Sequence, residues 1–333
     1  MRSSASWLWM VWLAACAPSV GPCRPSIHDA IARVQSREVA MDVRALEGDR
    51  SPTTNPLRLE YAKVFLQRSL LQLGFAVETQ PVTVHGSTSH NVIAERVGTL
   101  GPRAPVVLVG AHYDTVSFSP GADDNASGVA GLLAVARVVA AVRTRATVRL
   151  VAFTEEERDL GGSRVYVASL SREERARIRG AIVMDMIGYT RRDEGSQRYP
   201  RELSLVDLPH ELPRTGAFLA AFSLLGEGPV HRALLDARPY VRGLHVETLV
   251  LPRFLLGIMS DLSRSDHAPF WLAGIPAVSL TDTADFRSPH YHRGTDRSAT
   301  LDVHFAARSA RLAAATVLLL AELEQDGRCV DRG

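Results

Sequence analysis

The chain has 333 residues, 46% of them hydrophobic and 22% charged, so it can bury the core of a folded protein, and disorder is excluded as its main state. The formal net charge is +2 and the arginines are scattered along the sequence, which argues against a nucleic-acid partner. No internal repeat or long low-complexity linker divides the sequence. We therefore expect one large domain.

The N-terminus has the form of an export signal. Arg2 precedes an apolar stretch at residues 7–15 that is too short to cross a bilayer as a stable helix, so we interpret residues 1–15 as a signal peptide. The four residues that end at Cys16 resemble the bacterial lipobox. This resemblance implies an exported cell-envelope lipoprotein, anchored to the membrane by acyl chains on Cys16. Plain secretion is the alternative.

The predicted signal peptide is followed by a tether at residues 16–25 and a folded domain at residues 26–328. If Cys16 is acylated, Cys23 and Cys329 remain near the two ends of the mature chain, where they form a disulfide or stay as free thiols. The sequence does not indicate the oligomeric state.

Two helical segments open the predicted domain. Apolar residues recur at helical spacing over residues 26–47 and Gly48 gives a stop; a second helix begins at Pro56 and ends at Gly74. Predicted strands follow at residues 76–84, 91–97, 106–110, 147–153, 181–186 and 276–281.

From residue 106 onward, helices alternate with these strands. Residues 129–142 form an apolar helix, Ser171 and Glu174 form the capping box of a charged helix, and residues 303–325 form a closing helix. The alternation predicts an α/β fold, a central mixed and largely parallel sheet with helices on both faces. The segment 190–262, rich in Pro, Gly and Arg, is predicted to be a pocket-forming insertion.

Metal-type ligands follow three of the predicted strands. His112 follows the strand at 106–110, the Glu155–Glu157 triplet follows the strand at 147–153, and Asp185 closes the strand at 181–186. Such sheets bind ligands beyond the carboxyl ends of their strands, so we expect these side chains to meet in one crevice. Imidazole and carboxylate without cysteine suit zinc in a hydrolytic site.

These segments, in this order, resemble the family of cocatalytic dizinc aminopeptidases, which also contains the zinc-dependent glutaminyl cyclases. The matching segments are GAHYDTV (110–116), PGADDNASG (120–128), FTEEERDLGGS (153–163), MDMIGY (184–189), SDHAPFWLAGIPAV (265–278) and PHYHRGTD (289–296). The resemblance covers residues 60–325. It implies a zinc-exopeptidase fold and a metal-dependent exopeptidase, an aminopeptidase that acts on peptide substrates with two zinc ions.

Carried over to this sequence, the resemblance implies that His112 and Asp185 bind one zinc, that Glu157 and His292 bind the other, and that Asp124 bridges both. Each zinc would then keep an open position for a shared water, as catalysis requires.

The family's general base corresponds to Glu156. Because three glutamates are adjacent, a second register is possible, in which Glu155 is the base and Glu156 the ligand. Counting back from Gly162 and Ser163, which match the family's Gly-Ser, favours Glu156 and Glu157.

Three further features follow from the resemblance. Asp114 is expected to hold His112 in the tautomer that binds metal. Tyr291 is a candidate hydroxyl donor to the oxyanion, although a packing aromatic is an equally simple interpretation. The peptide bond between Asp124 and Asn125 is expected to be cis, as in relatives.

The sequence departs from the family pattern in two places. Arg293 and Arg297 stand where the family commonly has threonine, and two cations near the rim would favour acidic substrates. Glu155 replaces a small residue, and its charge would raise the pKa of Glu156.

Two other functions remain open at this point. A glutaminyl cyclase uses one zinc and characteristically lacks the second metal's histidine, so the retention of His112 argues against it. A binding lipoprotein that has lost activity would have the same fold, but such relatives usually lack a ligand or the base. Carboxypeptidase or dipeptide-specific activity on the same centre also stays possible, and the segment 190–262 is expected to decide the preference.

Overall fold

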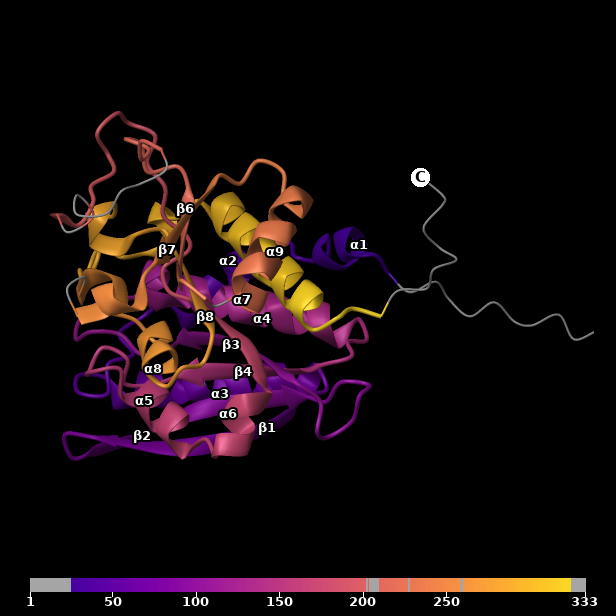
Figure 1. The fold of residues 1–333 in the computed structure, drawn as a ribbon. Coiled ribbons are helices and arrows are strands. Elements are labelled where there is room, and N and C mark those ends of the chain that lie inside the picture. The colour runs from indigo at the N-terminus through magenta and orange to yellow at the C-terminus, as the bar shows by residue number, and fades with distance from the viewer. Residues whose placement is uncertain (1–24, 202, 204–209, 227, 258–259, 325–333) are drawn as a thin grey trace, which may run out of the picture.

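The computed structural model describes residues 25–201, 203, 210–226, 228–257 and 260–324. The predicted signal peptide, the predicted anchor at Cys16, and the cysteines Cys23 and Cys329 lie outside the described residues. Figure 1 shows a twisted central sheet with helices on both faces. The predicted α/β fold in a single domain is confirmed.

Eight strands form the sheet in the order β1-β2-β4-β3-β5-β8-β6-β7. Their bounds are β1 Ala76–Val84, β2 Ser87–Arg96, β3 Val106–His112, β4 Thr147–Phe153, β5 Ile178–Met184, β6 Leu219–Leu224, β7 Val246–Leu251 and β8 Ala277–Thr281. The pairs β4/β3, β3/β5, β5/β8 and β6/β7 are parallel, whereas β1/β2, β2/β4 and β6/β8 are antiparallel. The sheet is therefore mixed, with a parallel centre.

The α-helices in the described part of the chain are α1 Ile27–Ile31, α2 Ser36–Leu46, α3 Pro56–Gln72, α4 Gly128–Ala140, α5 Gly161–Ser169, α6 Arg172–Arg177, α7 Gly228–Ala237, α8 His267–Leu272 and α9 Val303–Leu320. The single helix predicted at 26–47 is thus two helices. Between them, the carbonyl of Val34 accepts hydrogen bonds from the Arg311 guanidinium of α9 at 2.7 and 3.1 Å. The capping box at Ser171 and Glu174 is present at the start of α6.

Two hydrophobic cores hold the layers together, one on each face of the sheet. Alternate residues of β3 face opposite cores: Val107 and Val109 lie in the core that contains α2, α4 and α9, and Val106 and Leu108 lie in the core that contains α5 and α8. The helix α9 is long and apolar enough to cross a membrane, but 72% of it is buried inside the protein, where it packs against α4 and α7. It is a core helix of the fold.

The segment 190–262 contributes the strands β6 and β7, which the sequence did not predict. Both are six residues long and are flanked by turns rich in Gly, Pro and Arg, so neither gives a long alternating pattern. Side chains of the same segment also line the cavity described below.

Candidate metal centre

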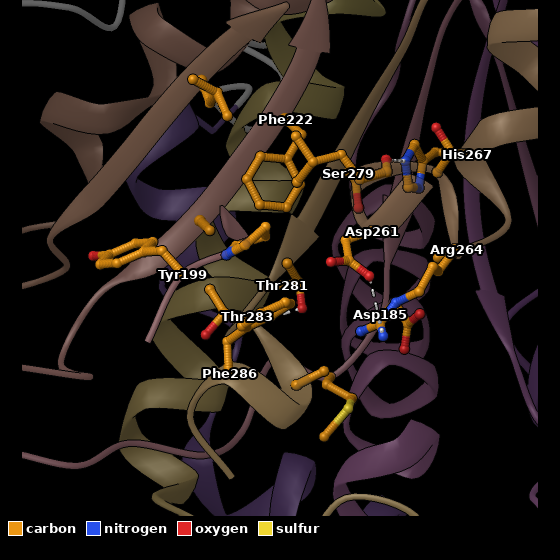
Figure 2. A pocket seen from close by; sticks show the side chains of 18 of the residues that line it. Asp185, Tyr199, Phe222, Asp261, Arg264, His267, Ser279, Thr281, Thr283 and Phe286 are labelled. Atoms are coloured by element: carbon orange, nitrogen blue, oxygen red, sulfur yellow. Dashed lines mark hydrogen bonds and ion pairs between the residues drawn. The ribbon is translucent and has the colours of Figure 1, made fainter. Parts of the chain in front are cut away.

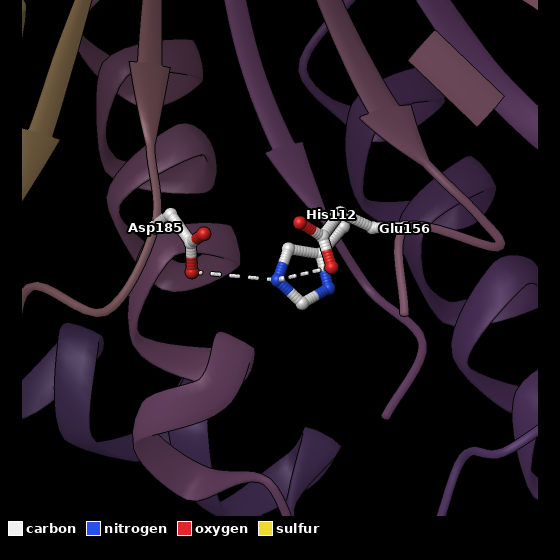
Figure 3. Close-up of side chains that lie close together, drawn as sticks. All are labelled: His112, Glu156 and Asp185. Carbon is white, nitrogen blue, oxygen red and sulfur yellow. Dashed lines mark hydrogen bonds and ion pairs between the residues drawn. The ribbon is translucent and has the colours of Figure 1, made fainter. Parts of the chain in front are cut away.

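The three parallel strands β3, β4 and β5 bring the predicted ligands together. His112 is the last residue of β3 and pairs in register with Phe153, the last residue of β4. The glutamate triplet at 155–157 and Asp185 follow β4 and β5 directly. Figure 3 shows His112, Glu156 and Asp185 facing one another beyond these strand ends.

Asp124 reaches the same place from the turn Ala122–Ser127 that precedes α4. Its peptide bond to Asn125 is cis, as the resemblance predicted. Gly121, just before this turn, has φ +57°, and a Cβ there would lie 2.3 Å from the Asp124 carbonyl oxygen. Only glycine fits this close approach.

The five predicted ligands form two adjacent sets that share Asp124. Its Oδ1 lies 3.4 Å from Nε2 of His112, which is also 3.4 Å from Oδ1 of Asp185. Its Oδ2 lies 3.2 Å from Nε2 of His292, which is 3.0 Å from Oε2 of Glu157. Two atoms bound to one tetrahedral zinc at about 2.0–2.1 Å are roughly 3.3 Å apart, so these spacings fit two such ions.

The charges of the cluster also fit divalent cations. Burial raises the pKa of Glu157 to about 7. Burial lowers the pKa of His292, but its contacts with the carboxylates of Asp124 and Glu157 outweigh this effect and raise the pKa to about 10. Burial also lowers the pKa of His112, but the surrounding carboxylates, Glu156 first among them, raise it well above its usual range. Both histidines thus act as counter-charges for buried carboxylates. A bound metal would take over this role and release their protons.

Glu156 lies beside the cluster and at the edge of the cavity. Its Oε2 is 3.9 Å from Nε2 of His112, longer than the ligand-to-ligand distances above. Burial raises its pKa well above the usual range, and neighbouring carboxylates add to the shift. The ligand atoms of His112, Glu156 and Asp185 all lie within 4.8 Å of one another, so proximity alone would allow Glu156 to be a ligand. We assign the ligand role to Asp124 rather than to Glu156, because each Asp124 oxygen lies closer to a histidine nitrogen than the Glu156 oxygen does.

Glu155 points away from the cluster. Its carboxylate accepts hydrogen bonds from Ser89 Oγ at 2.9 Å and from Arg158 Nη1 at 3.0 Å. Because Arg158 and Ser89 satisfy its charge, the expectation that Glu155 raises the pKa of Glu156 has no support in this geometry.

Asp114 contacts the glutamates more closely than it contacts His112. Its Oδ1 lies 3.6 Å from Nδ1 of His112, which is beyond hydrogen-bond distance. Its two oxygens accept the backbone N–H groups of Glu156 at 3.2 Å and Glu157 at 3.3 Å. Asp114 therefore fixes the backbone that carries two predicted functional residues.

Tyr291 and His292 stack, with ring centroids 3.7 Å apart and planes inclined by 21°. Tyr291 also lines the cavity, so it packs against a predicted ligand and is available to a substrate. His290 is turned elsewhere: its Nδ1 lies 3.0 Å from Thr295 Oγ1, and its ring meets Tyr189 edge-on.

The two predicted rim cations do not line the cavity. Arg297 Nη1 lies 3.5 Å from the Glu47 carboxylate, outside it. Arginines do line the cavity at other positions, namely Arg164, Arg198 and Arg264. The sequence did not single these out, because Arg164 lies in α5 whereas Arg198 and Arg264 lie in the segments around β6 to β8, and only the fold brings them to one cavity.

A cavity of about 450 Å³ opens from the cluster and lies against β6 and β8 (Figure 2). One part of its lining is apolar and consists of Tyr199, Leu203, Leu212, Phe218, Phe222 and Leu249. Another part is polar and includes Asp261, Arg264, Ser279, Thr281 and Thr283. Ser265 and His267, from the family-like segment at 265–278, line it as well, whereas Asp266 between them is buried at the start of α8.

Asp296 is a buried residue whose role the sequence did not predict. Its carboxylate accepts the backbone N–H groups of Asp123 at 2.9 Å and of Asp124 at 3.0 Å. It therefore connects the loop that carries His292 to the turn that carries Asp124. Its place in the GTD segment of the family pattern was the only signal in the sequence.

Comparison with known proteins identifies the family of this chain. Residues 91–209 match the model of peptidase family M28. The uncharacterized protein YfbL of Escherichia coli (strain K12) is 33% identical over 252 residues, which cover 72% of this chain and 73% of YfbL. This chain belongs to peptidase family M28.

Solved structures are similar in fold. BSAP, a zinc aminopeptidase from Bacillus subtilis, is 27% identical with a TM-score of 0.54, over 70% of this chain and 50% of that one. The aminopeptidase from Aneurinibacillus sp. strain AM-1 has a TM-score of 0.69 and 18% identity, over 90% of this chain and 97% of that one. The second likeness concerns the fold alone. This chain spans only half of the BSAP structure, so activity is not transferred from it directly.

Proposed function

We propose that this chain is an aminopeptidase that binds two zinc ions and removes N-terminal residues from peptides. The observation that carries the proposal is the position of Asp124, which offers one oxygen to each of two histidine–carboxylate pairs. A carboxylate shared in this way suits a pair of metal ions, because it supplies a ligand to each. We assign His112 and Asp185 to one ion, and Glu157 and His292 to the other. The zinc ions would lower the pKa of a water molecule and polarise the scissile carbonyl.

The protein's own residues supply the proton transfers. Glu156, with its raised pKa, takes the proton of the attacking water and passes it to the leaving amine. Asp114 holds the Glu156 backbone in place through its N–H group. The Tyr291 hydroxyl, at the cavity wall, donates a hydrogen bond to the oxyanion of the substrate.

The apolar part of the cavity lining supports a large hydrophobic N-terminal side chain as the preferred substrate. Phe222 lies in β6, Phe218 directly precedes β6, and Leu249 lies in β7. A leucine or phenylalanine side chain of the substrate would exchange water for apolar contact there. The expectation that Arg293 and Arg297 favour acidic substrates has no support, because neither arginine lines the cavity.

Metal analysis and a substrate panel test the proposal. The described domain should hold two zinc ions per chain and release chromogenic amines from leucyl and phenylalanyl anilides, and a chelator should abolish the activity. The variant Glu156→Gln should keep both ions and lose at least about 100-fold in kcat. Glu155→Gln is the matched control, because this adjacent glutamate faces Arg158, and it should stay active.

Three results would contradict the proposal. One zinc per chain with release of pyroglutamyl peptides would identify a glutaminyl cyclase. Two zinc ions with no turnover of any peptide would identify a binding protein. Full activity of Glu156→Gln would show that another residue is the base.

We also propose that the protein works in the cell envelope, held to the membrane by a lipid on Cys16. The lipobox-like sequence before Cys16 supports this, and the residue lies outside the described part of the chain. Expressed in a bacterium, the chain should incorporate labelled palmitate and fractionate with membranes, whereas Cys16→Ala should do neither.

A further inference from the structure

Arg50 is an arginine with no exposed surface, close to the predicted metal centre. Its guanidinium donates to five backbone carbonyls. The acceptors are Tyr113 at 2.7 Å, Leu46 at 2.5 Å, Gly48 at 3.0 Å, Pro120 at 3.0 Å and Gly121 at 2.9 Å. In the part of the chain that the structure describes, no carboxylate lies within 4.0 Å of this group. Arg50 therefore binds the backbone and forms no ion pair there.

The five carbonyls belong to three segments that meet at this side chain. Tyr113 lies between the predicted ligand His112 and Asp114. Pro120 and Gly121 lead directly into the turn that carries Asp124. Leu46 and Gly48 lie at the end of α2, and the Gly48 N–H donates to the Pro120 carbonyl at 2.8 Å. One planar fork of donors thus fixes the start of the β3–α4 connection, its end, and the end of α2 relative to one another.

The backbone of Arg50 makes the same connection. Its N–H donates to Thr115 Oγ1 at 2.9 Å, which ties the end of the β3 loop to the N-terminal segment. Burial lowers the Arg50 pKa to about 10, and the carboxylates of Asp296, Asp114 and Asp124 oppose this shift. Arg50 remains a cation at neutral pH, and its donors remain available.

We propose that Arg50 is a positioning residue that sets the relative placement of His112 and Asp124, and thereby the affinity of the zinc sites. This inference rests on the proposed function. The two ligands lie at opposite ends of the connection between β3 and α4, because His112 ends β3 and Asp124 lies in the turn before α4. The backbones beside them are joined here by bonds to one side chain. A small change at the guanidinium would therefore move one ligand with respect to the other.

Arg58 provides a matched control. Its Nη2 donates to the carbonyls of Ala45 at 3.0 Å and Glu47 at 2.8 Å, at the same end of α2. Among the described residues, Arg58 makes no hydrogen bond to the segment 113–124 between the two predicted ligands. Arg50→Lys and Arg58→Lys are the same chemical change, and each keeps the charge while it removes the fork of donors. Both variants should lose some thermal stability.

The experiment measures zinc retention against a competing chelator in the full-length protein, together with the visible absorption of the cobalt-substituted form. Arg50→Lys should bind zinc about 10- to 100-fold more weakly than the wild type and change the cobalt spectrum, whereas Arg58→Lys should match the wild type within about twofold. If Arg50→Lys fails to fold, Thr115→Val removes the acceptor of the Arg50 N–H and should weaken zinc binding several-fold.

The outcomes separate this inference from the proposed function. A wild type that binds no zinc contradicts the proposed function itself. A wild type with two zinc ions, and folded Arg50→Lys with unchanged zinc affinity and cobalt spectrum, overturns only the role of Arg50. Equal loss of zinc affinity in Arg50→Lys and Arg58→Lys also overturns it, because the effect would then be general destabilisation. If Arg50→Lys does not fold and Thr115→Val is used, unchanged zinc affinity in Thr115→Val also overturns the role of Arg50.

Discussion

The substitution Asp296→Asn tests how the turn that carries Asp124 is held. The two carboxylate oxygens of Asp296 accept separate backbone N–H groups, from Asp123 and Asp124, and the side chain is 1% exposed. An asparagine keeps one acceptor and places an N–H₂ donor against the other N–H. One buried N–H group is then left without a partner, which costs about 1–3 kcal/mol of the free energy of unfolding.

Asp302→Asn is the control for this prediction. Asp302 also accepts two backbone N–H groups, from His304 and Phe305, but both bonds end on its Oδ1, at the exposed start of α9. Asparagine can keep both bonds and is a good N-cap, so Asp302→Asn should lower the free energy of unfolding by less than about 0.5 kcal/mol. Urea unfolding measures the free energy of unfolding of each variant, and chelator competition measures its zinc affinity. Zinc affinity should fall about tenfold or more in Asp296→Asn and stay unchanged in Asp302→Asn. Equal behaviour of the two variants in both assays would refute the reasoning.

Four further outcomes are expected. Burial lowers the pKa of His267 to about 4, below its ordinary value of 6.5, so the folded state resists protonation. The free energy of unfolding should therefore fall as the pH drops from 6.5 to 4, by about 3 kcal/mol at pH 4. In urea titrations at several pH values, His267→Gln should make the free energy of unfolding less dependent on pH. Ala220→Phe, in the cavity lining, should reduce kcat/KM for leucyl anilide about tenfold relative to alanyl anilide, and an unchanged ratio would place the substrate side chain elsewhere. Leu312→Ala, in the core face of α9, should cost about 2–5 kcal/mol in denaturant unfolding. Chelation should lower the thermal midpoint and added zinc should restore it in a concentration-dependent way, because zinc binds the folded state; a midpoint insensitive to zinc would argue against the metal centre.

The central part of the fold could be predicted from the sequence. The strand β1 has the bounds expected for it. The strands β3 and β4 are mostly apolar and mostly buried, with Arg149 as the charged interruption in β4, which is typical of buried parallel strands. The strands β6 and β7 could not be predicted, because their pairing is set by contact with β8 and with each other. Short segments of mixed composition become strands only when a neighbour supplies the hydrogen bonds.

The predicted ligands could be found because metal binding restricts side chains to a few types at fixed places beyond the strands. His112 and Asp185 are recognisable as soon as the strands that carry them are drawn. The roles of adjacent glutamates were harder to assign. Glu155 and Glu156 differ in direction only because the backbone turns between β4 and α5, where Glu155 has φ +58°. No pattern of residue types reveals that turn.

The roles of the residues that support the centre could not be predicted, for a different reason. Asp296 and Arg50 act on backbone N–H and carbonyl groups, which every residue possesses, so their partners leave no mark in the sequence. An arginine after a helix stop looks like a surface residue until the chain closes over it. The ligands of such a centre are therefore chosen by side-chain chemistry, whereas their placement depends on a few buried charges that hold the intervening backbone. Substitutions at those charges should change metal affinity although no ligand has been touched.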